Sequence, residues 1–245
     1  MKDQHAVVTG GGSGIGAAVA KRLLADGFRV TLMGRSLGRL QAQQAALGDV
    51  LIQVCDVSDE TSVNGAFAAV GDVDILVNNA GQVETTPFAK TSLELWQRLL
   101  NVNLTGTFLC SRAVLPGMLM RKSGRIVNVA STAALKGYAY VAAYCAAKHG
   151  VLGLTRALAL EVATKGVTVN AVCPGYTETD IVESAVNTLV AKTGRTPEQA
   201  RTELSRANPQ GRLIRPDEVA DTVVWILGNG AINGQAIAVC GGETM

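Results

Sequence analysis

The chain has 245 residues, with 22 basic and 20 acidic side chains, so its net charge is close to neutral. This balance lacks the basic stripe that nucleic-acid binding needs. The five cysteines are scattered without a CxxC pair and the histidines number only two, which argues against a disulfide framework and a metal site. The start "MKDQHAVVTG" is not a secretory signal and no apolar run reaches about 18 residues, so we expect a cytoplasmic protein outside the membrane.

Charged residues make up only 17% of the chain, below the roughly 25% that is typical of soluble domains. A single exposed globule would carry more charge on its surface. We therefore expect part of the surface to be buried in a homo-oligomer.

Short apolar runs alternate with longer helical patterns along the whole sequence. In chain order, strands are expected at 5–9, 28–33, 50–55, 73–78, 124–131, 167–173 and 235–240, and helices at 14–27, 37–48, 60–70, 92–120, 141–164 and 216–227. This alternation with short connections predicts one α/β domain over residues 1–245. We expect a Rossmann-like, doubly wound parallel sheet of seven strands with helices on both faces.

Residues 176–215 interrupt this rhythm with a long polar excursion. Thr196, Pro197 and Gln199 fit the N-cap, N1 and N3 positions of a capping box, so a helix should begin there. The excursion follows the carboxyl end of a strand, where folds of this kind bind ligands. A substrate lid at about 176–215 is the favoured interpretation, and an inert surface insertion is the alternative.

The stretch "VVTGGGSGIG" joins the first strand to the first helix. Gly10, Gly14 and Gly16 allow a sharp backbone turn, and the helix start offers free N–H groups to a pyrophosphate. A glycine loop alone is weak evidence for a dinucleotide site, since any tight turn can use glycine. On the first strand-to-helix turn of a doubly wound fold it indicates dinucleotide binding.

The end of the second strand bears on which dinucleotide is bound. Gly34 stands where an NAD-preferring site usually carries an acid, and Arg35 follows it. A guanidinium can bind a 2′-phosphate through paired hydrogen bonds, whereas the alternative makes Arg35 a solvated residue at a helix start. NADP(H) is favoured, and NAD(H) stays open.

Three of the four tyrosines crowd one lysine in "GYAYVAAYCAAKHG". Tyr144 and Lys148 are one helical turn apart, so the ammonium should stabilise the phenolate and lower the pKa of the phenol. Ser131, at the end of the preceding strand, offers a hydroxyl to a substrate carbonyl. Tyr138 and Tyr140 stand just before the helix and are expected to line the approach of the substrate.

Over essentially its full length the chain resembles a short-chain dehydrogenase/reductase. The motifs that carry the resemblance are "TGGGSGIG" (9–16), "NNAG" (78–81), "NVNLTG" (101–106), Ser131, "YCAAK" (144–148) and "PGYTET" (174–179). The family usually forms tetramers through its two long helices. The resemblance therefore implies a homotetramer and hydride transfer between a secondary alcohol and a ketone.

The resemblance also implies roles for single residues. Tyr144 would be the general acid/base, Ser131 would position the carbonyl, Lys148 would also hold the nicotinamide ribose, and Asn103 would support a water-linked proton relay. Asn78 and Gly81 would belong to the turn beside the adenosine, with Asp56 at the adenine and Thr179 at the carboxamide. The full set of implied cofactor-binding residues is Gly10, Ser13, Gly14, Ile15, Gly16, Arg35, Asp56, Val57, Asn79, Ala80, Gly81, Tyr144, Lys148, Pro174, Gly175, Thr177 and Thr179. The implied substrate-binding residues are Ser131, Tyr138, Tyr140 and Tyr144.

The substrate is less constrained than the reaction. The tail "AIAVCGG" and the stretch "AKHGVLGLTRALALEVA" are most similar to reductases of β-ketoacyl thioesters. Residues 180–215 carry six basic and four acidic side chains, an excess that could meet the phosphates of coenzyme A or an acyl-carrier arm, or could be a solvated surface. The alternatives are a free alcohol, polyol or cyclic ketone as substrate, and a dinucleotide-binding sensor without catalysis.

Overall fold

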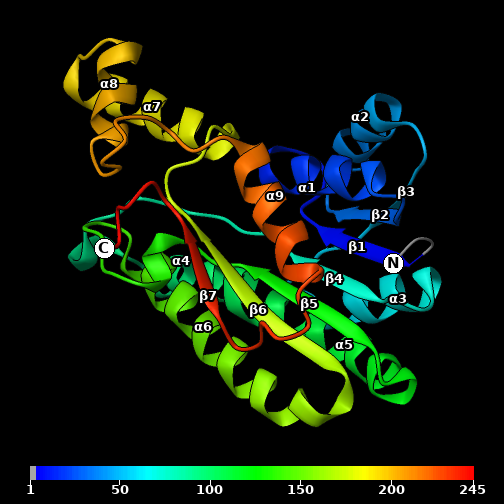
Figure 1. Ribbon diagram of the computed structural model, residues 1–245. Coiled ribbons are helices and arrows are strands. Elements are labelled where there is room, and N and C mark those ends of the chain that lie inside the picture. Colours follow the sequence, from blue (N-terminus) through cyan, green and yellow to red (C-terminus); the bar gives the residue numbers. More distant parts are fainter. Residues whose placement is uncertain (1–3) are drawn as a thin grey trace.

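Seven parallel strands form one sheet in the computed structural model, which describes residues 4–245 (Figure 1). The strands are β1 (His5–Thr9), β2 (Arg29–Gly34), β3 (Val50–Val54), β4 (Ile75–Asn78), β5 (Gly124–Val129), β6 (Val167–Pro174) and β7 (Ala236–Val239). Their order is β3-β2-β1-β4-β5-β6-β7, so the chain winds outward in both directions from the centre. The doubly wound sheet predicted from the sequence is confirmed.

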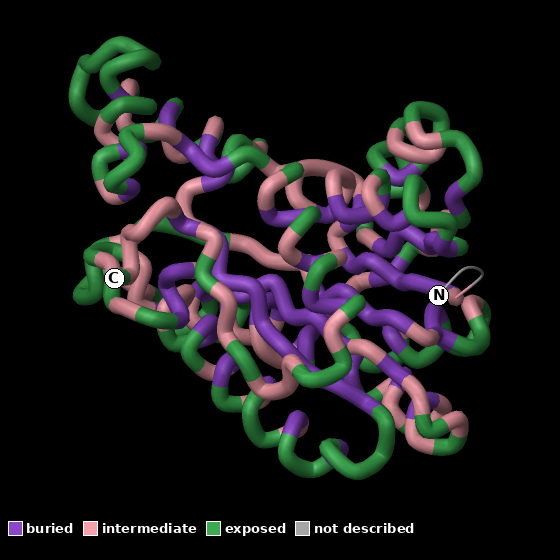
Figure 2. Tube along the Cα trace, viewed as in Figure 1, coloured by how far each residue is buried: buried purple, intermediate pink, exposed green. Residues whose placement is uncertain are grey.

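Helices cover both faces of the sheet (Figure 1). One face packs against α1 (Gly14–Ala25), α2 (Leu37–Leu47) and α9 (Pro216–Leu227), and the other against α3 (Glu60–Val70), α5 (Gly106–Arg121) and α6 (Ala142–Val162). Side chains alternate across β1, where Ala6 and Val8 join the first layer and Val7 joins the second. Each central strand is therefore buried on both sides, as its apolar sequence requires (Figure 2).

None of the helices within residues 4–245 has both the length and the apolar composition to cross a bilayer.

The helix expected over 92–120 contains an irregular turn. It consists of α4 (Leu93–Leu100), a π-helical turn at Asn101–Thr105, and α5. A π-turn places one extra residue in the turn and often marks a functional site. Here it lies at Asn103, which is fully buried.

The segment 176–215 is more structured than the sequence suggested. The capping box at Thr196 is present and opens α8 (Pro197–Ser205), as predicted, but the preceding helix α7 (Asp180–Thr193) was missed. The two helices form a hairpin that stands away from the sheet and exposes most of its outer surface (Figures 1 and 2). A small apolar core holds the hairpin together and consists of Val182, Val186, Ala200 and Leu213.

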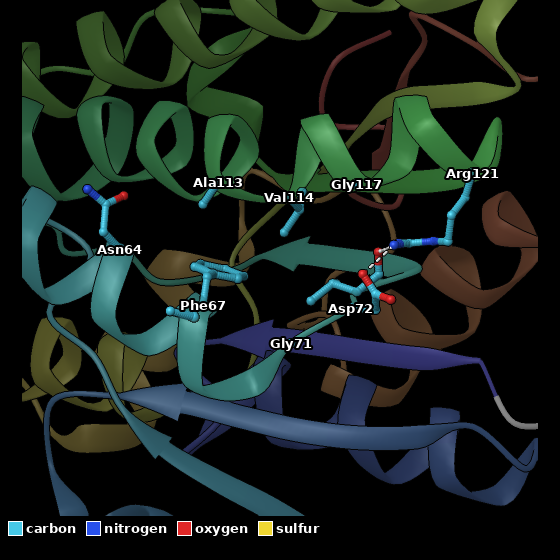
Figure 3. Close-up of a pocket in the computed structure, with 10 residues that line it drawn as sticks. Asn64, Phe67, Gly71, Asp72, Ala113, Val114, Gly117 and Arg121 are labelled. Carbon is cyan, nitrogen blue, oxygen red and sulfur yellow. Dashed lines mark hydrogen bonds and ion pairs between the residues drawn. The ribbon is translucent and has the colours of Figure 1, made fainter.

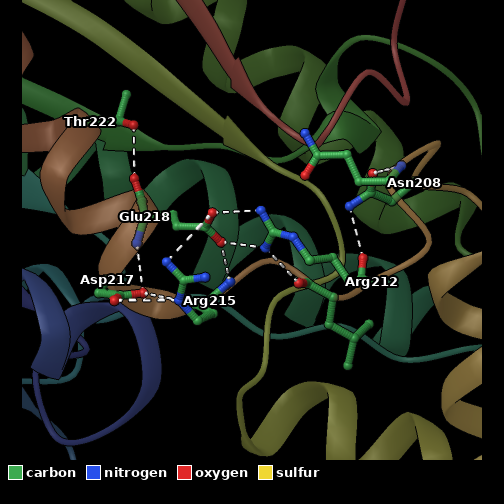
Figure 4. A network of polar contacts seen from close by, with 8 residues as sticks. Asn208, Arg212, Arg215, Asp217, Glu218 and Thr222 are labelled. Atoms are coloured by element: carbon green, nitrogen blue, oxygen red, sulfur yellow. Dashed lines mark hydrogen bonds and ion pairs between the residues drawn. The ribbon is translucent and has the colours of Figure 1, made fainter.

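A polar network anchors the hairpin where the chain returns to the sheet (Figure 4). Arg212 donates two hydrogen bonds of 2.7 Å to the Glu218 carboxylate, which also accepts the backbone N–H of Arg215 at 2.8 Å. The Arg212 guanidinium is the main reason that the pKa of Glu218 falls to about 2. Because Glu218 lies in the first turn of α9, the same carboxylate caps that helix and fixes the base of the hairpin.

Candidate active site at the carboxyl edge of the sheet

A cleft of about 700 Å³ lies along the carboxyl edge of the sheet. It is bounded by the turns that follow β1, β2, β3 and β4 and by the start of α7. The predicted cofactor residues that line it are Gly10, Ser13, Gly14, Ile15, Arg35, Asp56, Val57, Asn79, Ala80, Gly81 and Thr179. The structure thus gathers most of the implied dinucleotide set into one cavity.

The glycine loop is shaped for a close approach of backbone to ligand. Gly14 has a φ of +54°, a conformation that other residues rarely adopt. A Cβ at Gly16 would lie 2.4 Å from the Gly10 carbonyl oxygen, so the loop and α1 pack too closely for any side chain there. The start of α1 presents its unpaired N–H groups to this cleft, as the pyrophosphate of a dinucleotide requires. The residues present fit such a cofactor.

Asn79 fastens the turn after β4 to the glycine loop. Its amide donates to the carbonyl oxygens of Thr9 at 3.0 Å and Gly10 at 3.2 Å. Asn78, which the resemblance placed in the same turn, points elsewhere: it donates to Ser111 and Asn128 and is buried. Of these two residues only Asn79 lines the cleft, and the place of Asn78 in a turn beside the adenosine stays a prediction.

Three of the predicted cofactor residues, at the end of β6 and in the turn that follows it, do not line this cavity: Pro174, Gly175 and Thr177. Pro174 ends β6, and the buried Thr177 hydroxyl donates to the Gly175 carbonyl at 3.0 Å, which stabilises the turn. Thr179 alone of this turn reaches the glycine loop, where its methyl group would lie 3.0 Å from a Cβ at Gly14. The turn therefore brings the start of α7 against the opposite side of the cleft.

The sequence reading missed part of the lining, chiefly Ser36, Arg39, Leu40 and Asp180. Arg39 lies in the first turn of α2 and pairs with Asp180 at 3.3 Å. The available signal was Ser36, a good N-cap residue, because the first turn of a helix that starts there faces the same cleft as the end of β2. Two arginines thus line the cleft after β2.

Tyr144, Ser131 and Lys148 come together beside this cleft. The Lys148 side chain is buried and donates to the Val129 carbonyl at 2.8 Å. Its ammonium lies 5.6 Å from the centre of the Tyr144 ring. Burial lowers the pKa of Lys148 to about 8, so the side chain is still mainly protonated at neutral pH.

Burial also governs the phenol. It raises the pKa of Tyr144 to about 12, and the nearby Ser131 hydroxyl only partly opposes the rise. The sequence suggested the opposite direction, because it showed the neighbouring lysine and not the loss of water around the phenol. Tyr144 is therefore a neutral phenol, the form that can donate a proton.

Asn103 borders the same group of residues from the π-turn. Its amide oxygen accepts the Gln82 N–H at 3.1 Å, and its NH₂ group donates to the Gln82 carbonyl at 2.8 Å and the Leu99 carbonyl at 2.9 Å. A Cβ at Gly81 would lie 2.9 Å from the Asn103 oxygen and 3.7 Å from the Lys148 nitrogen. Gly81 therefore keeps open the space between Asn103 and Lys148.

The two tyrosines before α6 differ in their surroundings. Tyr138 is half-buried and its ring packs edge-on against Tyr176, with centroids 6.4 Å apart. Tyr140 is 62% exposed and has a φ of +67°, a strained value for a residue other than glycine. Its carbonyl accepts the Thr86 N–H at 2.8 Å, which ties the two loops together. Their contact with substrate stays a prediction.

The basic excess of residues 180–215 is largely neutralised within the protein. Arg195 and Arg206 pair with Glu203, Arg201 pairs with Glu183, and Arg212 and Arg215 pair with Glu218. Exposed ion pairs of this kind contribute little to stability, but they leave little net positive charge on this surface. This arrangement favours the interpretation as a solvated surface over a phosphate-binding patch.

A second hollow, of about 320 Å³, lies between α3 and α5 (Figure 3). Arg121 donates there to the Asp72 carboxylate at 2.5 Å and the Val73 carbonyl at 2.7 Å. Asp72 and Val73 precede β4, so this hollow lies at the amino edge of the sheet, opposite the cleft. Its lining within residues 4–245 shares no residue with the predicted site.

The fold and the cleft define a dinucleotide-binding oxidoreductase of the α/β class. The model of the short chain dehydrogenase family matches residues 4–190, and the chain belongs to that family. A provisionally named ketoacyl reductase of Streptomyces coelicolor is 41% identical and spans 97% of this chain and 95% of its own. An acetoacetyl-CoA reductase of Shinella zoogloeoides is 39% identical and spans 97% of both chains. The crystal structure of a variant of actinorhodin polyketide ketoreductase with NADPH has a TM-score of 0.96 and 39% identity, and covers 100% of this chain and 99% of that one.

The low pKa of Lys148 gives a pH dependence. We expect kcat/KM for ketone reduction to be level near neutrality and to fall above about pH 8, as the ammonium beside Tyr144 loses its proton. Lys148→Met should lower kcat/KM near neutral pH by about a hundredfold, and kcat/KM of this variant should no longer fall at high pH. Steady-state pH profiles measure both effects, with the exposed Lys165→Met as control. A wild-type profile without a fall up to about pH 10 would contradict the lowered pKa of Lys148.

Proposed function

We propose that this chain is an NADPH-dependent reductase of 3-ketoacyl thioesters, which it converts to 3-hydroxyacyl thioesters. One observation carries the proposal: the Tyr144 ring, with the buried Lys148 ammonium 5.6 Å from its centre, stands beside a dinucleotide cleft. Similarity to a ketoacyl reductase and an acetoacetyl-CoA reductase supports the thioester as substrate.

In the proposed mechanism, a bound nicotinamide would supply the hydride to the carbonyl carbon. The Ser131 hydroxyl orients the carbonyl oxygen of the substrate. Tyr144 donates its phenolic proton to that oxygen as the C–O double bond becomes a single bond. The Lys148 ammonium stabilises the phenolate that remains, and Asn103 supports the return of a proton from solvent.

Two alternatives fit the same fold. A free alcohol, polyol or cyclic ketone could be the substrate, because the proton-transfer residues act on any carbonyl. A sensor that binds the dinucleotide without catalysis is less well supported, since it would need none of Asn103, Ser131, Tyr144 and Lys148. All four are present and lie close to Gly81 or to one another.

The test is a panel of ketones with a change at the proton donor. The wild-type protein should oxidise NADPH with acetoacetyl-CoA more efficiently than with a cyclic diketone or a keto sugar. Tyr144→Phe should lower kcat by about 10²- to 10⁴-fold, because only the phenolic proton is lost, and cofactor affinity should stay nearly unchanged. Near-full activity of Tyr144→Phe would refute its role, turnover of free ketones alone would favour the first alternative, and binding without turnover the second.

We propose NADP(H) as the preferred cofactor. Gly34 at the end of β2 offers no carboxylate to the adenosine ribose, and the Arg35 and Arg39 guanidinium groups line the cleft directly after it. These arginines would pair with a 2′-phosphate, which NADH lacks. A structural relative at 39% identity was solved with NADPH.

The preference can be measured through Arg35. We expect a lower KM for NADPH than for NADH, and Arg35→Asp should raise the KM for NADPH by about tenfold or more, because a cation at the phosphate becomes an anion. The KM for NADH should change little or fall. A wild-type preference for NADH would show that the cofactor assignment is wrong.

We further propose a homotetramer. Leu93 and Leu160 are about four-fifths exposed on α4 and α6, and Phe108 is exposed on α5. Large apolar side chains on neighbouring helices indicate a protein–protein contact. Light scattering should give a mass four times that of the 25.4 kDa chain, and a monomer at assay concentration would contradict the proposal.

A further inference from the structure

Glu243, two residues before the final Met245, has an unexpected environment. Its side chain is only 1% exposed, although glutamate side chains are almost never fully buried unless they are paired. A buried carboxylate is costly unless positive charge and hydrogen bonds surround it. The partners of Glu243 therefore indicate what the end of the chain does.

The partners belong to the loop that follows Ser131. The Lys136 ammonium lies 3.2 Å from the Glu243 carboxylate and also donates to its backbone carbonyl at 3.3 Å. The Tyr138 hydroxyl donates to the same carboxylate oxygen. Burial and this carboxylate raise the pKa of Tyr138, so the phenol keeps its proton for that bond.

The chain of hydrogen bonds extends to the residue beside Ser131. The hydroxyl oxygens of Tyr138 and Thr132 are 2.6 Å apart. Since Tyr138 gives its proton to Glu243, Thr132 must donate to Tyr138. The orientation of Tyr138 is thus fixed from both sides.

Glu243 also touches the opposite wall of the site. A Cβ at Gly175 would lie 3.0 Å from its second carboxylate oxygen, so the absence of a side chain at Gly175 admits the carboxylate. Tyr138 in turn meets Tyr176, and Tyr176 packs on the apolar core of the α7–α8 hairpin. One carboxylate therefore links the loop after β5 to the turn after β6.

The turn that carries Glu243 is built to reach this position. Gly241 and Gly242 have φ values of +62° and +97°, and a Cβ at Gly241 would collide with the Asn208 side chain, 2.0 Å from its oxygen. Asn208 lies in the network that anchors the return from α8 (Figure 4). The C-terminal turn is therefore wedged between the loop after Ser131 and the base of the hairpin.

We propose that Glu243 is a positioning residue for the substrate, an inference that rests on the proposed reductase function. It holds Tyr138, and through Tyr138 the base of the hairpin, so that the wall next to Ser131 keeps its shape. Glu243 acts on substrate affinity and leaves hydride and proton transfer, which Tyr144 and the cofactor perform, nearly unchanged.

The kinetic test uses Glu243→Gln, Tyr138→Phe and the double variant. Each single change should raise the KM for acetoacetyl-CoA by about tenfold, the effect of one hydrogen bond to a charged group, with kcat altered by less than about threefold. The double variant should be no worse than the worse single, because both changes remove the same bond. Glu60→Gln, which disturbs an exposed pair with Arg112, is the matched control.

A second measurement needs no turnover. Trypsin should cut faster after the exposed Lys192, in the last turn of α7, or after Arg195, in the connection to α8, in Glu243→Gln and Tyr138→Phe than in the wild type or Glu60→Gln. Wild-type KM and wild-type cleavage in both variants would overturn the role of Glu243. If Glu243→Gln does not fold, the same two measurements on Tyr138→Phe decide.

The two proposals can fail separately. If the wild-type protein reduces no ketone, the proposed function is wrong, and the cleavage rates alone decide whether Glu243 holds the hairpin. If the wild type reduces acetoacetyl-CoA and the variants show unchanged KM with additive losses in kcat, the reductase stands and the positioning role falls.

Discussion

The parallel direction of all seven strands is the constraint on which the site depends. Parallel strands end at the same edge, so seven separate turns must meet there. Gly10 follows β1, Arg35 follows β2, and Asn79 follows β4. Ser131 follows β5, and Glu243 follows β7. Residues up to 233 positions apart are assembled by sheet topology alone, and each turn needs only one or two suitable side chains.

Burial at this edge sets the chemistry of the two central groups in opposite directions. The same loss of water that raises the pKa of the Tyr144 phenol lowers that of the Lys148 ammonium. Burial drives the two pKa values apart, to about 12 for Tyr144 and about 8 for Lys148, although the free groups have nearly equal pKa values of about 10. A neutral phenol beside an ammonium can deliver its proton to a carbonyl oxygen, and the same two groups serve the reverse reaction.

Much of this arrangement was predictable because it is local. Apolar period gave the strands and most helices, and the capping box gave the start of α8. The π-turn at Asn103 could not be predicted, because an extra residue in one turn leaves the apolar pattern of a helix intact. The direction of the Asn78 side chain depends on the register of β4, which the sequence does not show. Helix α7 was not predicted because it lies in a stretch whose polar composition indicates a loop. The contact of Glu243 with Tyr138 joins residues 105 positions apart, which no local pattern can report.

The distribution of charge separates the two ends of the site. On the adenosine side, Arg35 and Arg39 line the cleft where a phosphate would bind, and Arg39 pairs there with Asp180. On the substrate side, Glu243 neutralises Lys136, the one charged residue of "TAALKGYAYVAAY", and Glu84 pairs with Arg98 at 2.6 Å. The hairpin arginines are paired as well. A ketone bound beside Ser131 and Tyr144 would therefore meet a wall of low net charge, where affinity would come from fit and from these two hydroxyls. If Glu243 acts as proposed, selection by shape rather than charge would make the position of Tyr138 part of the specificity of the site.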